Sequence, residues 1–200
     1  MQRGKNRRRD VAMSTVCLML ALTATSVRAQ QAATAEDIVD RLSALDATAD
    51  VDVAALHQQV IDRIKSKANA VALKRPPIAP QLRKLPHLDL DIQFNPDSPV
   101  IRPDSYRMLG RVADALSDLK MLSFGFLIVG HMDSTGRRED SLTLSQRRAE
   151  SFRDALVTTF KISPKRIQAI GLGEEQLLDA EHPKAAVNQE IQIVTVRKGP

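Results

Sequence analysis

Two charged residues near the middle of the chain have the types and the spacing to bind a zwitterion. Asp133 follows an unbroken apolar run, residues 124–129, which is typical of a buried strand that ends at Gly130. A turn at 134–136 precedes a helix, and its 3.6-residue period puts Arg148 on the flank of the apolar stripe, whereas Arg147 points away. The sequence therefore predicts an acid at a strand end that faces an arginine on the next helix.

This arrangement suits the head of an amino acid. The carboxylate of Asp133 would accept hydrogen bonds from an ammonium group, and the guanidinium of Arg148 would bind a carboxylate as a two-pronged fork. A plain Asp133–Arg148 salt bridge that closes the corner between strand and helix is the alternative, because structural ion pairs outnumber binding sites.

The elements that must position these residues follow from the alternation of apolar and polar residues. The expected order is a strand at 88–94, a helix beginning at Pro103, a strand at 124–129, a helix ending at Phe160, and strands at 167–172 and 191–195. The order β-α-β-α-β-β predicts an α+β fold, a two-layer sandwich with helices on one face of a mixed four-stranded sheet.

The stretch 130–149, GHMDSTGRREDSLTLSQRRA, also resembles a known family. It is similar to the C-terminal peptidoglycan-binding domain of OmpA-like proteins, whose signature is roughly GHTD-x-x-G-x-x-x-YN-x-x-LS-x-x-RA. The positions that match are Gly130, His131, Asp133, Gly136, Leu144, Ser145, Arg148 and Ala149. The resemblance extends over residues 87–198, and so many positions in register make it far more specific than a single short motif.

The resemblance implies a function as well as a fold. In the family, the Asp and the Arg at these positions hold the diaminopimelate of the cell-wall peptide, which implies that Asp133 and Arg148 bind peptidoglycan. The loop after the first strand lies beside the ligand in the family, so Asp97 is a candidate at the rim, with a plain Asx-type turn as the alternative. Thr135, Ser141 and Ser145, in the same stretch, complete the set of candidate ligand-binding residues.

Several positions depart from the family pattern. Met132 replaces a threonine, Asp140 and Ser141 replace Tyr-Asn, and Gln189 and Glu190 replace the two arginines of an NRRVEI motif near the end. These differences leave a second hypothesis, an OmpA-like scaffold that has lost wall binding and serves in protein–protein interaction. A groove filled by Glu190 paired to Arg148 would favour that hypothesis, and an open groove between Asp133, Arg148 and Asp97 would favour a ligand.

Residues 1–29 have the features of a secretory signal peptide. A basic start precedes an apolar core, Val11 to Leu22, and a small residue, Ala29, closes the segment, although an uncleaved anchor is the alternative. Cys17, the only cysteine, lies inside this segment. The segment carries six of the 29 basic residues and one of the 24 acidic ones, so the rest of the chain is balanced at 23 of each. We therefore expect a protein of the periplasm, associated with the wall or outer membrane, and no nucleic-acid partner.

Residues 30–74 form a short helical region. Amphipathic spacing predicts two helices, one with a possible cap at Thr34 and Asp37 and one with Val53, Leu56, Val60 and Ile64 on its stripe. The region is either a loose spacer or an arm that docks on the domain, on a second copy or on another envelope protein. Residues 75–86 are expected to be a proline-rich linker, and residues 87–198 the OmpA-like domain. The segment before the domain is too short for a membrane barrel of its own.

Catalysis is not expected. The residue types of His131, Asp133 and Ser145 could suggest a hydrolase, but Ser145 falls on the core side of its helix and not at an exposed elbow. The four histidines have no metal-ligand spacing, and the expected mature chain has no thiol, so we expect neither a metal nor another cofactor.

Overall fold

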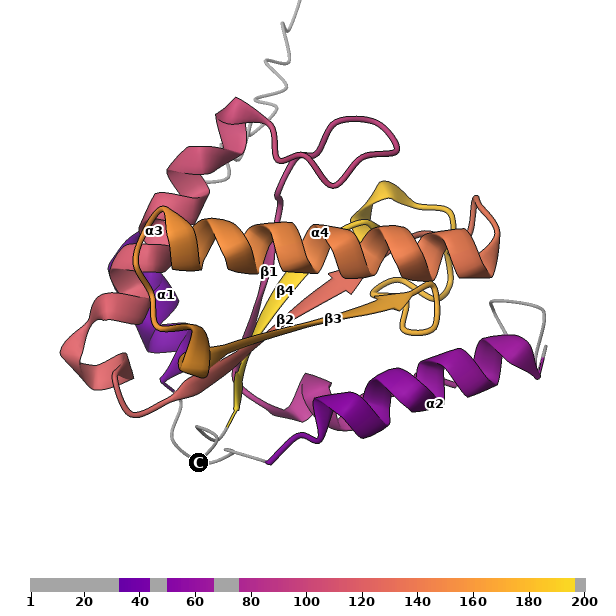
Figure 1. Ribbon diagram of the computed structural model, residues 1–200, viewed down its shortest axis with the longest axis horizontal. Coiled ribbons are helices and arrows are strands. Elements are labelled where there is room, and N and C mark those ends of the chain that lie inside the picture. Colours follow the sequence, from indigo (N-terminus) through magenta and orange to yellow (C-terminus); the bar gives the residue numbers. More distant parts are fainter. Residues whose placement is uncertain (1–32, 44–49, 67–75, 197–200) are drawn as a thin grey trace, which may run out of the picture. The chain divides into compact units, whose positions relative to one another are not determined.

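A mixed four-stranded sheet forms the centre of the computed structural model, which describes residues 33–43, 50–66 and 76–196 (Figure 1). The predicted signal peptide, with Cys17, lies outside the described residues. The strands are β1 (His87–Leu90), β2 (Gly125–His131), β3 (Ile167–Gly173) and β4 (Ile191–Val196), in the order β1-β4-β2-β3. β2 and β3 are parallel, and β4 is antiparallel to both β1 and β2. The predicted α+β fold is confirmed.

The first strand is shorter than the alternation at 88–94 suggests. β1 ends at Leu90, which pairs with Ile191, the first residue of β4. Beyond Leu90, β4 offers no further residues for β1 to pair with. Phe94 instead forms an isolated bridge with Ile101. The chain between them forms a loop that contacts Arg148 through the Ser98 carbonyl oxygen.

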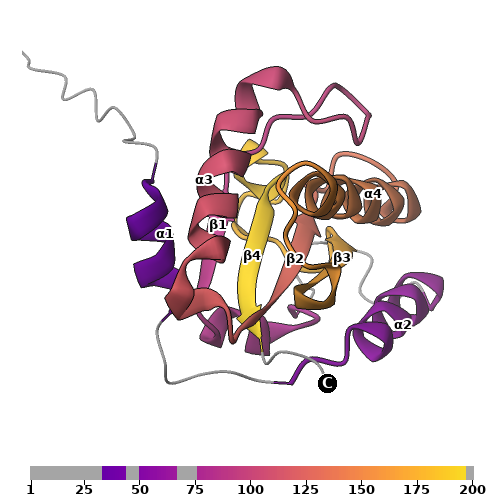
Figure 2. The ribbon, with the colours of Figure 1, turned by 60° about the vertical axis from the view of Figure 1, so that its left-hand side comes forward.

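Helices α3 (Tyr106–Ser117) and α4 (Arg138–Thr158) cover one face of the sheet, as predicted. Short 3-10 turns follow α3 at Leu119–Met121 and precede β3 at Pro164–Arg166. Helix α1 (Ala35–Leu42) lies beside α3 and β1 (Figure 2). It begins with the expected capping box, in which Thr34 and Asp37 bond each other's backbone N–H groups. The last residue of α1 is joined to the sheet, since the Thr195 hydroxyl of β4 donates a hydrogen bond to the Leu42 carbonyl oxygen at 2.8 Å.

The opposite face of the sheet is also covered, because residues of the N-terminal helical region dock on the domain, one of the two alternatives left open by the sequence. Helix α2 (Val53–Lys65) and the 3-10 helix η2 (Pro80–Lys84) pack there, so that α2 and α4 lie on opposite sides of the strands (Figure 1). The buried residues of this second core are Leu56, Val60, Ile64, Ala79, Leu82, Leu85, Leu127, Val129, Ile170, Leu172 and Val194. An unbroken apolar strand such as β2 needs cover on both faces, and this layer supplies it.

Polar contacts hold the second layer in place. The carboxylate of Glu175, after β3, contacts Arg138 of α4 at 2.7 Å and Arg63 of α2 at 3.9 Å. The Gln176 side chain accepts a hydrogen bond from the backbone of Ala79 at 2.9 Å. The segment 75–86, which is expected to be a linker, therefore packs on the sheet from Ala79 onward, and its Leu82 is fully buried.

Candidate functional site

Asp133 lies two residues beyond β2 and is only 4% exposed. Its Oδ1 atom accepts from the Thr135 hydroxyl at 2.6 Å and from the Thr135 backbone N–H at 3.2 Å. Its Oδ2 atom accepts from the side-chain amide of Gln189 at 2.8 Å. The carboxylate is therefore held in place by neutral donors.

Arg148 lies on the sheet side of α4, 7% exposed, while Arg147 is exposed, as the helical period predicts. Its Nε atom donates to the Ser98 carbonyl oxygen at 3.2 Å, and Nη1 lies 3.4 Å from the sulfur of Met132. The guanidinium carbon lies 4.9 Å from the centre of the Phe94 ring. This arginine is fixed by a loop, a ring and a thioether, and none of these cancels its charge.

The two charges do not pair directly. Among the described residues, no ion pair joins Asp133 to Arg148, so the strand–helix salt bridge considered above is not formed. Burial lowers the pKa of Arg148, and the carboxylates of Asp97 and Asp133 act in the opposite direction. Asp97 is exposed in the loop between Phe94 and Ile101, where its φ of 49° is left-handed. The structure thus brings together Asp133, Thr135, Arg148 and Asp97.

The two serines among the sequence candidates have other surroundings. Ser145 is fully buried, and its hydroxyl donates to the Leu142 carbonyl and accepts from the backbone of Gly173, both at 2.9 Å. Ser141 is 4% exposed, and its oxygen lies beside the turn at Gly136. Ser145 therefore ties α4 to β3, and its two hydrogen bonds go to backbone atoms of residues outside the candidate set.

Three glycines let α4 come this close to the sheet. A Cβ atom on Gly130 would lie 2.2 Å from the backbone oxygen of Ser145, and one on Gly171 would lie 2.2 Å from the backbone nitrogen of Gln146. Gly173 adds a positive φ of 52°. The side chains of Ser145 and Gln146 accept hydrogen bonds from the backbone of the edge strand β3. This contact fixes the distance of α4 from the sheet, and therefore also the position of Arg148, which lies about one helical turn after Ser145.

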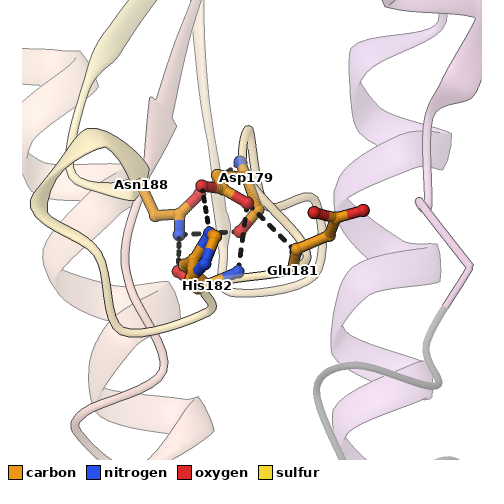
Figure 3. Close-up of polar contacts among 4 residues, drawn as sticks. All are labelled: Asp179, Glu181, His182 and Asn188. Atoms are coloured by element: carbon orange, nitrogen blue, oxygen red, sulfur yellow. Dashed lines mark hydrogen bonds and ion pairs between the residues drawn. The ribbon is translucent and has the colours of Figure 1, made fainter.

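The loop before β4 carries Gln189 to Asp133. Fully buried Asn188 bonds the backbone of Asp179 and His182, and the Asp179 carboxylate accepts from the backbone of Glu181 and His182 and from the His182 ring (Figure 3). The Ser134 N–H donates to the Pro183 carbonyl at 2.9 Å, which joins this loop to the turn after β2. Gln189 departs from the family pattern, but its contact with Asp133 could not be predicted from the sequence, because two segments 56 residues apart meet only in the fold.

The electrostatic neighbours of Glu190 are acidic residues and not Arg148. Burial, together with Asp89 and Asp91, raises the pKa of Glu190 to about 6. Within the described ranges no ion pair links it to Arg148. The feature that would have favoured a closed scaffold is therefore not seen there.

His131 is a buried structural residue. It is 1% exposed, and its Nδ1 atom lies 3.0 Å from the Gln176 carbonyl oxygen, which makes Nδ1 the protonated nitrogen. Burial lowers the pKa of His131 from 6.5 to about 4.

This pKa predicts acid lability. Between pH 6.5 and 4 the His131 ring is protonated in the unfolded chain but neutral in the folded protein. The contribution of this residue to the free energy of unfolding is therefore fully present at pH 7 and is lost as the pH falls. The shift corresponds to about 3 kcal/mol. Urea unfolding of His131→Asn should show a pH dependence reduced by about this amount over that interval. His182→Asn, at an exposed ring, serves as the control, and an unchanged pH dependence in His131→Asn would contradict the assignment.

The remaining features of the described residues add no second centre. No group of three or more potential ligands there could hold a metal ion. No helix in that part of the chain has the length and apolar character needed to cross a bilayer.

Comparison with known protein sequences agrees with the motif. Residues 93–190 match the model of the OmpA family. The peptidoglycan-associated lipoprotein of Rhizobium meliloti is 35% identical over 108 residues, which are 54% of this chain and 60% of that protein. Outer membrane porin F of Pseudomonas fluorescens is 32% identical over 107 residues, 52% of this chain and 32% of the porin.

Solved structures resemble the same part of the chain. The crystal structure of the peptidoglycan-associated lipoprotein from Burkholderia pseudomallei covers 52% of this chain and 86% of its own, with 28% identity and a TM-score of 0.44. The chain thus spans about a third of the porin and three fifths of the Rhizobium lipoprotein. Residues 93–190 of this chain are a domain of the OmpA family.

Proposed function

We propose that this protein is a non-catalytic envelope protein that binds peptidoglycan through Asp133 and Arg148. The observation that carries the proposal is the way the two charges are held. Each is at least nine-tenths buried, each has its own partners, and neither neutralises the other by contact. Such a preorganised pair of opposite charges fits a zwitterion, whose ammonium group pairs with Asp133 and whose carboxylate pairs with Arg148.

The chemistry of the ligand follows from the proposal. Diaminopimelate in a wall peptide retains an amino group and a carboxylate on one carbon, and this is the zwitterionic head that the pair can recognise. Asp97 and Thr135 flank the two charges and would line the rim. Relatives named as peptidoglycan-associated lipoproteins support this ligand class.

We extend the proposal to the organisation of the chain. Residues 1–29 direct export to the periplasm, residues 87–198 hold the wall, and residues 30–86 connect the domain to its surroundings. Because α1 and α2 are packed on the sheet, their outer surfaces, and not an extended arm, are what another envelope protein or a second copy would contact.

Co-sedimentation with purified diaminopimelate-type peptidoglycan tests the function. Wild type should pellet with the wall, and Asp133→Asn should lose binding by about tenfold or more, because the ammonium loses its charged acceptor while the side chain keeps its shape. Asp140→Asn removes an exposed acid from the neighbouring helix and should pellet like wild type. Equal pelleting of Asp133→Asn and wild type would refute the site.

A further inference from the structure

We propose that Gln189 is a displaceable amide latch on Asp133, which the ligand's ammonium group must push aside, so that Gln189 sets the affinity of the site. This inference rests on the proposed function and adds to it a residue that controls binding.

The Asp133 carboxylate has few acceptor positions left. Two carboxylate oxygens offer about four lone-pair sites. Thr135 takes two of them at Oδ1, and the Gln189 amide takes one at Oδ2. One site therefore remains, on Oδ2, and an incoming ammonium group that donates two of its three N–H bonds to this oxygen must displace the Gln189 amide.

The backbone of Gln189 is fixed while its side chain is exposed. Its N–H donates to the Ala186 carbonyl at 2.9 Å, and the preceding Asn188 is fully buried within the bonded loop of Figure 3. The Gln189 residue itself is exposed. An unbranched side chain on an anchored backbone can swing away from Asp133 into solvent without moving the loop.

Replacement of the Gln189 amide by the ligand's ammonium group at Oδ2 is favourable, because the ammonium is a charged donor. An ammonium–carboxylate hydrogen bond is stronger than one from a neutral amide, so the ligand displaces Gln189 but gives up part of its gain to do so. The bond that Gln189 makes in the free protein also keeps the buried carboxylate satisfied, which explains why an acid at 4% exposure is tolerated when no ligand is bound.

Removing the latch should therefore tighten binding. The test is calorimetric titration of the soluble stem tripeptide L-Ala-γ-D-Glu-meso-diaminopimelate into wild type, Gln189→Ala, Gln168→Ala and Asp133→Asn. Gln189→Ala should bind about two- to tenfold more tightly than wild type, the value of one net hydrogen bond. Gln168→Ala removes an exposed glutamine from β3 and should match wild type. The side-chain amide signals of Gln189 in NMR spectra should also shift when the tripeptide is added.

The outcomes separate the latch from the function. If Asp133→Asn abolishes binding while Gln189→Ala binds as wild type does, or more weakly, the site stands and the latch is wrong. If Asp133→Asn binds like wild type, both the site and the latch are wrong. If neither wild type nor Gln189→Ala binds, both also fail, because an opened site should then accept the ligand. Binding by Gln189→Ala alone would support the latch.

Discussion

Replacing Arg148 by alanine is expected to weaken binding to diaminopimelate-type peptidoglycan by about thirtyfold or more. Truncating one side of a buried charge pair costs about 2 kcal/mol or more, because the ligand's carboxylate is left in the pocket without a partner. The effect should exceed that of any rim residue, since Arg148 is 7% exposed and Asp97 is exposed. Co-sedimentation over a range of wall concentrations gives the measurement.

Arg148→Lys separates charge from geometry. Lysine keeps the positive charge but lacks the planar fork and the Nε–H that reaches the Ser98 carbonyl. We expect it to bind about tenfold more weakly than wild type but better than Arg148→Ala. Thermal unfolding of both variants must first show a folded protein, because the guanidinium also packs on Phe94. A folded Arg148→Ala that pellets as wild type does would remove the arginine from the site.

The sheet and the helix that carries Arg148 could be predicted because they depend on local patterns. The apolar run before Gly130 and the 3.6-residue period after it were sufficient to place Asp133 at a strand end and to turn Arg148, and not Arg147, toward the sheet. A strand that is apolar at consecutive positions must be covered on both faces. The amphipathic stripe of residues 53–64 supplies the second cover, but its spacing alone could not distinguish an arm docked on the domain from a loose spacer.

The partners of the charges could not be predicted, because they come from segments distant in sequence. Ser98 lies 50 residues from Arg148, and Gln189 lies 56 residues from Asp133. A spacing rule can place two residues on neighbouring elements, but it cannot say whether they touch. For that reason the spacing alone also allows a direct salt bridge, whereas in the structure each charge has other partners. Ser145 illustrates the converse, because a motif position in register with a ligand site is here a bond between helix and strand.

A large loss of stability is expected from Gly130→Ala. The new Cβ atom would lie 2.2 Å from the Ser145 carbonyl oxygen and 2.9 Å from its carbon, both of them backbone atoms of α4. The helix must move away from β2, which should cost about 3 kcal/mol or more and lower Tm by about 6–12 °C. Because Arg148 is one turn from Ser145, wall binding should fall as well. Thermal and urea unfolding give the first quantity, and co-sedimentation gives the second.

Gly110→Ala is the matched control, since it adds the same methyl group to a glycine with room for it. The nearest atom to its Cβ is Cε1 of Phe160 at 3.8 Å, an ordinary contact, and Gly110 lies inside α3. Alanine loses less backbone freedom than glycine when a helix folds, so this variant should be more stable by about 0.5–1 kcal/mol. Opposite signs for the two substitutions would show that close contact between α4 and β2, and not loss of glycine as such, controls the site. Equal stability of Gly130→Ala and wild type would mean that α4 can shift without cost, and Arg148 would then have no fixed position from which to bind a ligand.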